Sequence, residues 1–131
     1  MFAKPTTMFQ TACILCGTAV ALGAFGAHGL KNHLTPEMLV IYEVGVRYQF
    51  YHGLALLAFS LGADGLWRSP WAPRACIGWI LGCLIFSGSL YLLALTGVRW
   101  LGAITPIGGV ALILGWLFAA LSARSWRNPN V

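Results

Sequence analysis

Four long apolar runs constrain the fold of this chain more than any other feature of its sequence. A helix needs about 20 consecutive apolar residues to cross the hydrocarbon core of a bilayer. The four runs have about this length, and the short connections between them predict that consecutive helices pack as antiparallel neighbours. We therefore expect an all-α, polytopic membrane protein, with residues 1–131 forming one domain, a bundle of four transmembrane helices. The expected helices cover residues 8–27, 36–63, 76–95 and 106–123.

Composition favours a membrane protein over a water-soluble one. Of the 131 residues, 59% are hydrophobic and 8% are charged, and the mean hydropathy is +0.78. A soluble domain carries about 25% charged residues, so this chain cannot cover a surface that faces water. The net charge of +5 comes from basic residues that stand singly between apolar runs. We therefore expect the lipid bilayer as the surrounding medium and no nucleic acid as a partner.

The basic residues also predict the orientation of the chain. With four spans, both termini and the second loop share one side of the membrane. The other side carries Lys31, Arg99 and, at the mouth of the second helix, Arg47. Because positively charged loops stay in the cytoplasm, we expect both termini there. The five basic residues on that side are Lys4, Arg68, Arg74, Arg124 and Arg127.

Two threonine–proline pairs predict where helices start. Thr35-Pro36 and Thr105-Pro106 each combine a capping residue with a proline suited to the first helical position. The second helix is expected to start at Pro36, with its first turns at the membrane interface and the chain turning inward near Gly45.

The densest group of polar residues lies in the second helix, from Glu43 to His52. Glu43 and Arg47 are four residues apart with the acid first, the favourable order for a helical ion pair, so we expect them to be paired. Two interpretations stay open: a polar site near the outer face that binds a ligand or moves a proton, or an interfacial anchor for the helix. The candidates for ligand binding or ion pairing are Glu43, Arg47, Tyr48, Tyr51, His52 and His28.

Histidines and cysteines raise the question of a cofactor. His28 is expected near the outer boundary, about one helical turn in depth from His52, and two histidines can ligate a haem. Four thiolates can hold zinc or an iron–sulfur cluster. Cysteine is also a frequent small packing residue, and no cofactor slot is evident. We expect neither a cofactor nor a metal site, so the cysteines should serve packing: Cys13, Cys16, Cys76 and Cys83.

The sequence does not match the common enzyme templates. Its carboxylates are Glu37, Glu43 and Asp64, and Asp64 is expected on the opposite side of the membrane from the other two. No glycine-rich phosphate loop or nucleophile-elbow motif occurs. We therefore expect a protein that is not an enzyme.

Small residues at four-residue spacing predict close helix packing. Gly78 and Gly82 in the third run have this small-xxx-small spacing, as do residues 111, 115, 119 and 123 in the fourth. Such stripes serve packing inside one bundle or between copies, and the sequence leaves this choice open.

Four stretches together resemble the family called domain of unknown function 423, which includes YgdD-like bacterial membrane proteins and the mitochondrial transmembrane protein 256. They are residues 23–30 (GAFGAHGL), 48–55 (YQFYHGLA), 86–91 (FSGSLY) and 104–109 (ITPIGG), the last followed by Gly115-Trp116. The resemblance implies a four-helix protein of the bacterial inner membrane. It supplies no catalytic residues.

The expected function is that of a non-enzymatic accessory or scaffold subunit that meets its partners within the membrane. Its short loops leave little soluble surface, so a homo-oligomer or a larger membrane complex is the expected assembly. The first alternative is a small transporter or channel component that uses Glu43, Arg47, Tyr48 and His52. The second alternative is a haem- or metal-binding redox protein.

Overall fold

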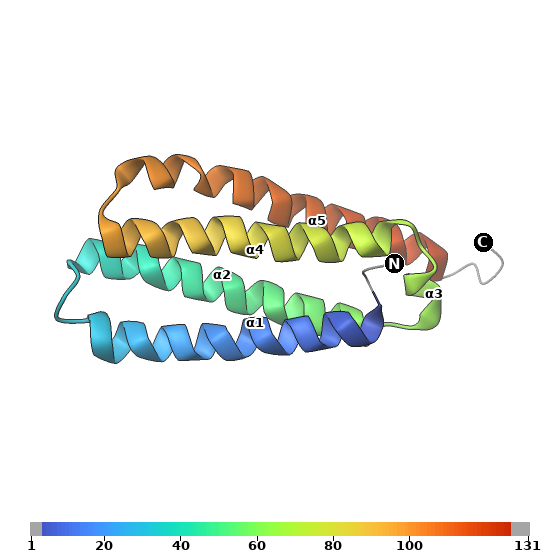
Figure 1. Cartoon of the computed structure of the whole chain (residues 1–131). Helices are drawn as coiled ribbons and strands as arrows, with labels where there is room; N and C mark the ends of the chain where they lie inside the picture. The colour runs from blue at the N-terminus through green and yellow to red at the C-terminus, as the bar shows by residue number, and fades with distance from the viewer. Residues whose placement is uncertain (1–3, 127–131) are drawn as a thin grey trace.

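The computed structural model describes residues 4–126 and consists of long helices that run side by side (Figure 1). Each long helix packs on the next long helix in the chain: α1 on α2, α2 on α4, and α4 on α5. In chain order the elements are α1 (Pro5–Phe25), the π-helical turn η1 (Gly26–Leu30), α2 (Pro36–Ser60), the short α3 (Asp64–Trp67), α4 (Trp71–Thr96), the 3₁₀ helix η2 (Arg99–Ala103) and α5 (Thr105–Trp126).

Three helical segments of the described chain are long and apolar enough to cross a membrane. They are Pro5–Leu30, Trp71–Thr96 and Arg99–Ser125. The expected all-helical fold is therefore confirmed, with three candidate membrane spans among the described residues. Helix α2 is 25 residues long but carries Glu37, Glu43 and Arg47, and it is not among the three.

Helix α2 starts as its capping signal predicts, but its course differs from the expected one. The Thr35 side chain accepts a hydrogen bond from the backbone N–H of Met38 at 3.3 Å, and Pro36 is the first helical residue. The expected inward turn near Gly45 is wrong, because α2 runs unbroken to Ser60. The glycine instead permits close packing: a Cβ atom there would lie 2.8 Å from the Tyr91 ring.

The second threonine–proline pair plays a different part from the expected one. Thr105 is the first residue of α5 rather than the residue before the helix. Its hydroxyl lies 2.7 Å from the hydroxyl of Ser89, so this hydrogen bond joins α5 to α4.

Glycines allow a close approach between α4 and α5. A Cβ atom added to Gly78 would lie 2.9 Å from the Cα atom of Gly115 and 3.0 Å from the carbonyl oxygen of Ala111. Both atoms belong to the backbone, so neither can move aside without shifting the helix. Around this crossing lies a core that includes Leu56 of α2, Trp79 of α4 and residues of α1.

We predict that Gly78→Ala destabilises the protein by about 1–3 kcal/mol, because the added methyl group forces α4 and α5 apart. The measurement is the free energy of unfolding in detergent or bicelles. Gly88→Ala on the same helix is the control, since a Cβ atom there has nothing within 4 Å. Equal stability of the two variants would contradict the close crossing.

Candidate functional site

Gln49 fixes the position of α2 against its two neighbours. Its amide nitrogen donates to the Leu15 carbonyl at 3.0 Å and to the Thr18 hydroxyl at 2.8 Å, and its amide oxygen accepts from the Tyr91 hydroxyl at 2.8 Å. Three helices thus meet at one buried side chain. Thr18 is thirteen residues after the start and twelve before the end of the first candidate span, Pro5–Leu30. Gln49 therefore lies level with the middle of that span.

The sequence did not single out Gln49, although it stands inside the polar segment. Its partners lie 31 to 42 residues away on α1 and α4, and no local spacing reveals them. The available signal was an uncharged polar side chain in the middle of an otherwise apolar stretch.

The expected ion pair between Glu43 and Arg47 is confirmed. A guanidinium nitrogen of Arg47 lies 3.2 Å from a carboxylate oxygen of Glu43. Both side chains are open to the surroundings, with exposed fractions of 62% for Arg47 and 57% for Glu43. The chain therefore carries an ion pair on the outer surface of α2.

The depth of this pair differs from the expected one. At 1.5 Å per residue, Arg47 lies only about 3 Å along the helix axis from Gln49, and Glu43 about 9 Å. Both are thus nearer the middle of the neighbouring span than the expected place near the outer face, and both lie on the outer side of Gln49. The sequence suggested that place because the apolar part of the helix starts at Val46, ten residues after the first helical residue, Pro36.

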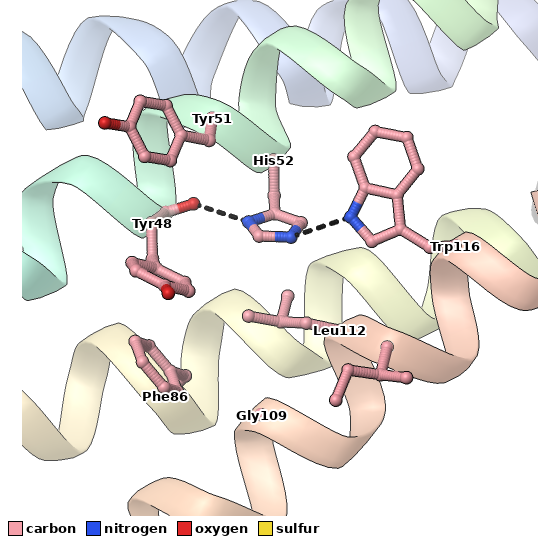
Figure 2. A pocket seen from close by; sticks show the side chains of 8 residues that line it. Tyr48, Tyr51, His52, Phe86, Gly109, Leu112 and Trp116 are labelled. Atoms are coloured by element: carbon pink, nitrogen blue, oxygen red, sulfur yellow. Dashed lines mark hydrogen bonds between the residues drawn. The ribbon is translucent and has the colours of Figure 1, made fainter.

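A groove lies between α2 and α5 with α4 at its base, and Figure 2 shows its lining side chains. His52 of α2 is 6% exposed and receives a hydrogen bond from the indole nitrogen of Trp116 at 3.1 Å. Beyond this bond, the rings of Tyr48 and Phe86 stack with centroids 4.5 Å apart. The His52–Trp116 bond thus connects two helices that are otherwise separated by the groove.

The two hydrogen bonds of His52 define its tautomer. The other ring nitrogen, Nδ1, lies 2.7 Å from the backbone carbonyl oxygen of Tyr48. An indole N–H only donates, so the Nε2 atom of His52 must be the acceptor and carry no proton. The proton then sits on Nδ1 and is donated to Tyr48. In this arrangement His52 is a neutral, fully bonded side chain.

The chemistry of the groove suits a neutral, apolar molecule. Its volume is about 530 Å³, within the range of small-molecule sites. Tyr48 and Tyr51 contribute exposed rings, and none of the described residues that line it is charged. The lining residues are Tyr48, Tyr51, His52, Phe86, Gly109, Leu112, Ile113 and Trp116.

His28 does not join the other candidates. It is exposed on η1, next to Gly26, which packs on the Tyr42 ring of α2. Ten residues separate Tyr42 from His52, which is about 15 Å along the helix. The expected separation of one turn is therefore wrong, and the two histidines are too far apart in depth to ligate one haem iron.

The four cysteines differ in exposure and in surroundings. Cys13 is exposed, the sulfur of Cys16 packs against Gly53, and Cys76 and Cys83 are buried in the core. Within residues 4–126, no three histidine, cysteine or acidic side chains gather in a geometry that would hold a metal ion.

Comparisons with known proteins place these helices among bacterial membrane proteins. Residues 22–109 match the family described as "Protein of unknown function (DUF423)". A UPF0382 membrane protein of Staphylococcus epidermidis is 51% identical over 114 residues, which are 84% of this chain and 88% of that protein. The UPF0382 membrane protein YwdK of Bacillus subtilis is 44% identical over 80% of this chain and 85% of its own. For a Haemophilus influenzae relative the identity is 43%, with 86% and 87% covered. No solved structure matches this chain.

We predict that Gln49→Leu lowers the free energy of unfolding by about 1–3 kcal/mol, because it removes three interhelical hydrogen bonds. The measurement is unfolding in mixed micelles. Gln10→Leu is the matched control, since Gln10 is exposed on α1. A Gln49 variant as stable as this control would show that the amide does not hold the helices together.

A second prediction concerns the protonation of His52. With ¹⁵N-labelled histidine, the His52 signals should show a protonated Nδ1 and an unprotonated Nε2. Trp116→Phe should shift the Nε2 signal, because its donor is lost, whereas Trp100→Phe should not. A proton found on Nε2 in the unmodified protein would contradict the hydrogen-bond assignment.

Proposed function

The chain belongs to the DUF423 family, and from this premise we propose that it is a four-span, non-enzymatic membrane protein that serves as an accessory or scaffold subunit of an assembly within the bilayer. The observation that carries the proposal is the exposed Glu43–Arg47 pair on α2. An ion pair at this depth is unfavourable where α2 faces lipid. A protein partner that covers this surface removes the pair from lipid.

Chain topology supports a fourth span. Helices α1 and α4 belong to two of the candidate spans, and α1 ends at the end of the bundle opposite to where α4 starts (Figure 1). The chain must therefore return across the membrane between residues 31 and 70. Helix α2 is the long helix that makes this return, and it takes Glu43 and Arg47 with it.

The cost of leaving the pair in lipid supports a covering partner. A charged side chain near the centre of a bilayer costs about 2.5–3.5 kcal/mol on insertion scales. Arginine relieves this cost when its head reaches the headgroups. Arg47 lies about 3 Å from the middle of the span, and the hydrocarbon core extends about 15 Å from its middle, so about 12 Å separates it from the headgroups, which is too far for one side chain to reach. Contact with polar groups of another protein chain gives both charges further partners without distorting the bilayer.

The basic residues support an orientation with the chain termini in the cytoplasm of a bacterium. Lys4, Arg68, Arg74 and Arg124 lie at the end of the bundle where α1 starts, and Lys31 and Arg99 lie at the other end. Arg47 leaves this count because it lies at mid-depth, and Arg127 is outside the described residues. Four basic residues at one end against two at the other favour the same orientation under the positive-inside rule.

One observation favours a second candidate, a small transporter or channel component. The groove beside His52 opens between α2 and α5 near mid-depth and has the size of a ligand site. A lipid-soluble substrate that binds there and is carried across would support this function over a scaffold.

We predict that native mass spectrometry of protein extracted with its surrounding lipid shows a defined assembly rather than a single chain. Arg47→Gln should weaken that assembly about tenfold, or about 1.4 kcal/mol, because it leaves a carboxylate unpaired at the interface. Lys31→Gln, which removes a charge from a loop, is the control. A wild-type protein that stays a single chain at every concentration would contradict the scaffold proposal.

A further inference from the structure

The exposed face of α2 forms one continuous stripe. Along it the exposed residues recur at three- and four-residue intervals, which keeps them on one side of the helix. Val40, Arg47 and Leu54 are seven residues apart, and so are Tyr51 and Ala58. A seven-residue repeat is the spacing of a seam between two helices that cross at a shallow angle. The stripe consists of Val40, Glu43, Arg47, Tyr51, Leu54 and Ala58.

The charges on this stripe complement themselves. Copies of one membrane protein share one orientation, so a pair related by a two-fold axis along the membrane normal places α2 parallel to α2 of its partner. Each residue then meets its own counterpart at the same depth. Arg47 lies one turn from Glu43, so each guanidinium also reaches the carboxylate of the other copy. Two positive and two negative charges alternate around the axis, and each charge has two opposite neighbours.

We propose that the partner on this face is a second copy of the chain, joined along the α2 stripe with the Glu43 and Arg47 side chains of both copies forming one four-charge cluster. The inference rests on the proposed function, since it names the partner of the same surface. It follows from three observations together: an exposed ion pair, its level at mid-span, and a seven-residue seam around it. The charged cluster sets the register of the two helices, as a polar residue does in an otherwise apolar seam.

The first test is a disulfide cross-link through Leu54. The background is Cys13→Ser, because Cys13 is the exposed cysteine. Leu54→Cys should give a covalent dimer in native membranes on mild oxidation, since the two Leu54 positions face each other across the axis. Leu81→Cys on α4 is the control, because Leu81 is exposed to a similar extent, 49% against 43% for Leu54. The Leu81→Cys variant should give at least about tenfold less covalent dimer than the Leu54→Cys variant.

The second test reverses charges and separates a second copy from a foreign partner. Arg47→Glu places four carboxylates around the axis, so the Leu54→Cys cross-link should fall about tenfold. Adding Glu43→Arg to this variant restores two positive and two negative charges, so the cross-link should return. A foreign partner has fixed charges, and the double reversal would not restore binding to it. Helix content by circular dichroism checks that each variant folds.

The outcomes separate this inference from the function on which it rests. A Leu54 cross-link that is lost on single reversal and restored on double reversal supports the α2 dimer. An assembly with another protein that depends on Arg47, without a Leu54 cross-link, overturns the dimer and leaves the scaffold function standing. A single chain in native membranes, with no cross-link, overturns both.

Discussion

The hydrogen bonds of Gln49 fix how the central helix α2 lies in the bundle. They hold α2 between α1 and α4 and set its level, because the amide reaches Thr18 on one side and Tyr91 on the other. In a bilayer, apolar side chains do not drive helices together, so such polar contacts and close packing decide the arrangement. Once Gln49 is level with mid-span, the positions of Glu43, Arg47 and His52 follow.

Helix α2, held at this level, presents three different faces. Its buried face carries Gln49 and Gly45, which meet α1 and α4. A second face carries Tyr48 and His52, which line the groove toward α5 (Figure 2). The third carries the ion pair and has no partner within the described chain. Because Gln49 and His52 are hydrogen-bonded inside the molecule, the third face is where we expect this protein to meet another chain.

The sequence predicted the helical class and the local pairing, and the structure supplied what lies between helices. Glu43 and Arg47 could be paired in advance because four-residue spacing is a property of one helix. Thr35 and Pro36 marked a helix start for the same reason. The bond between His52 and Trp116 spans 64 residues, and it depends on how two helices are rotated and aligned. Uniformly apolar runs have no distinct face, so they leave both rotation and level open. This is also why the sequence alone suggested a place for the ion pair closer to the outer face than its level beside Gln49.

A nitroxide label on the α2 stripe, in protein held in a lipid nanodisc, reports whether lipid, water or protein surrounds this stripe. With the label at position 54 of the Cys13→Ser protein, power saturation reports collisions with oxygen, which dissolves in lipid, and with a nickel chelate, which stays in water. A stripe at bilayer depth covered by protein predicts low accessibility to both, whereas a label at position 81 on α4 should collide freely with oxygen. Oxygen accessibility at position 54 as high as at position 81 would show the stripe bare in lipid. High accessibility to nickel would place the stripe in water. Either result would contradict the account.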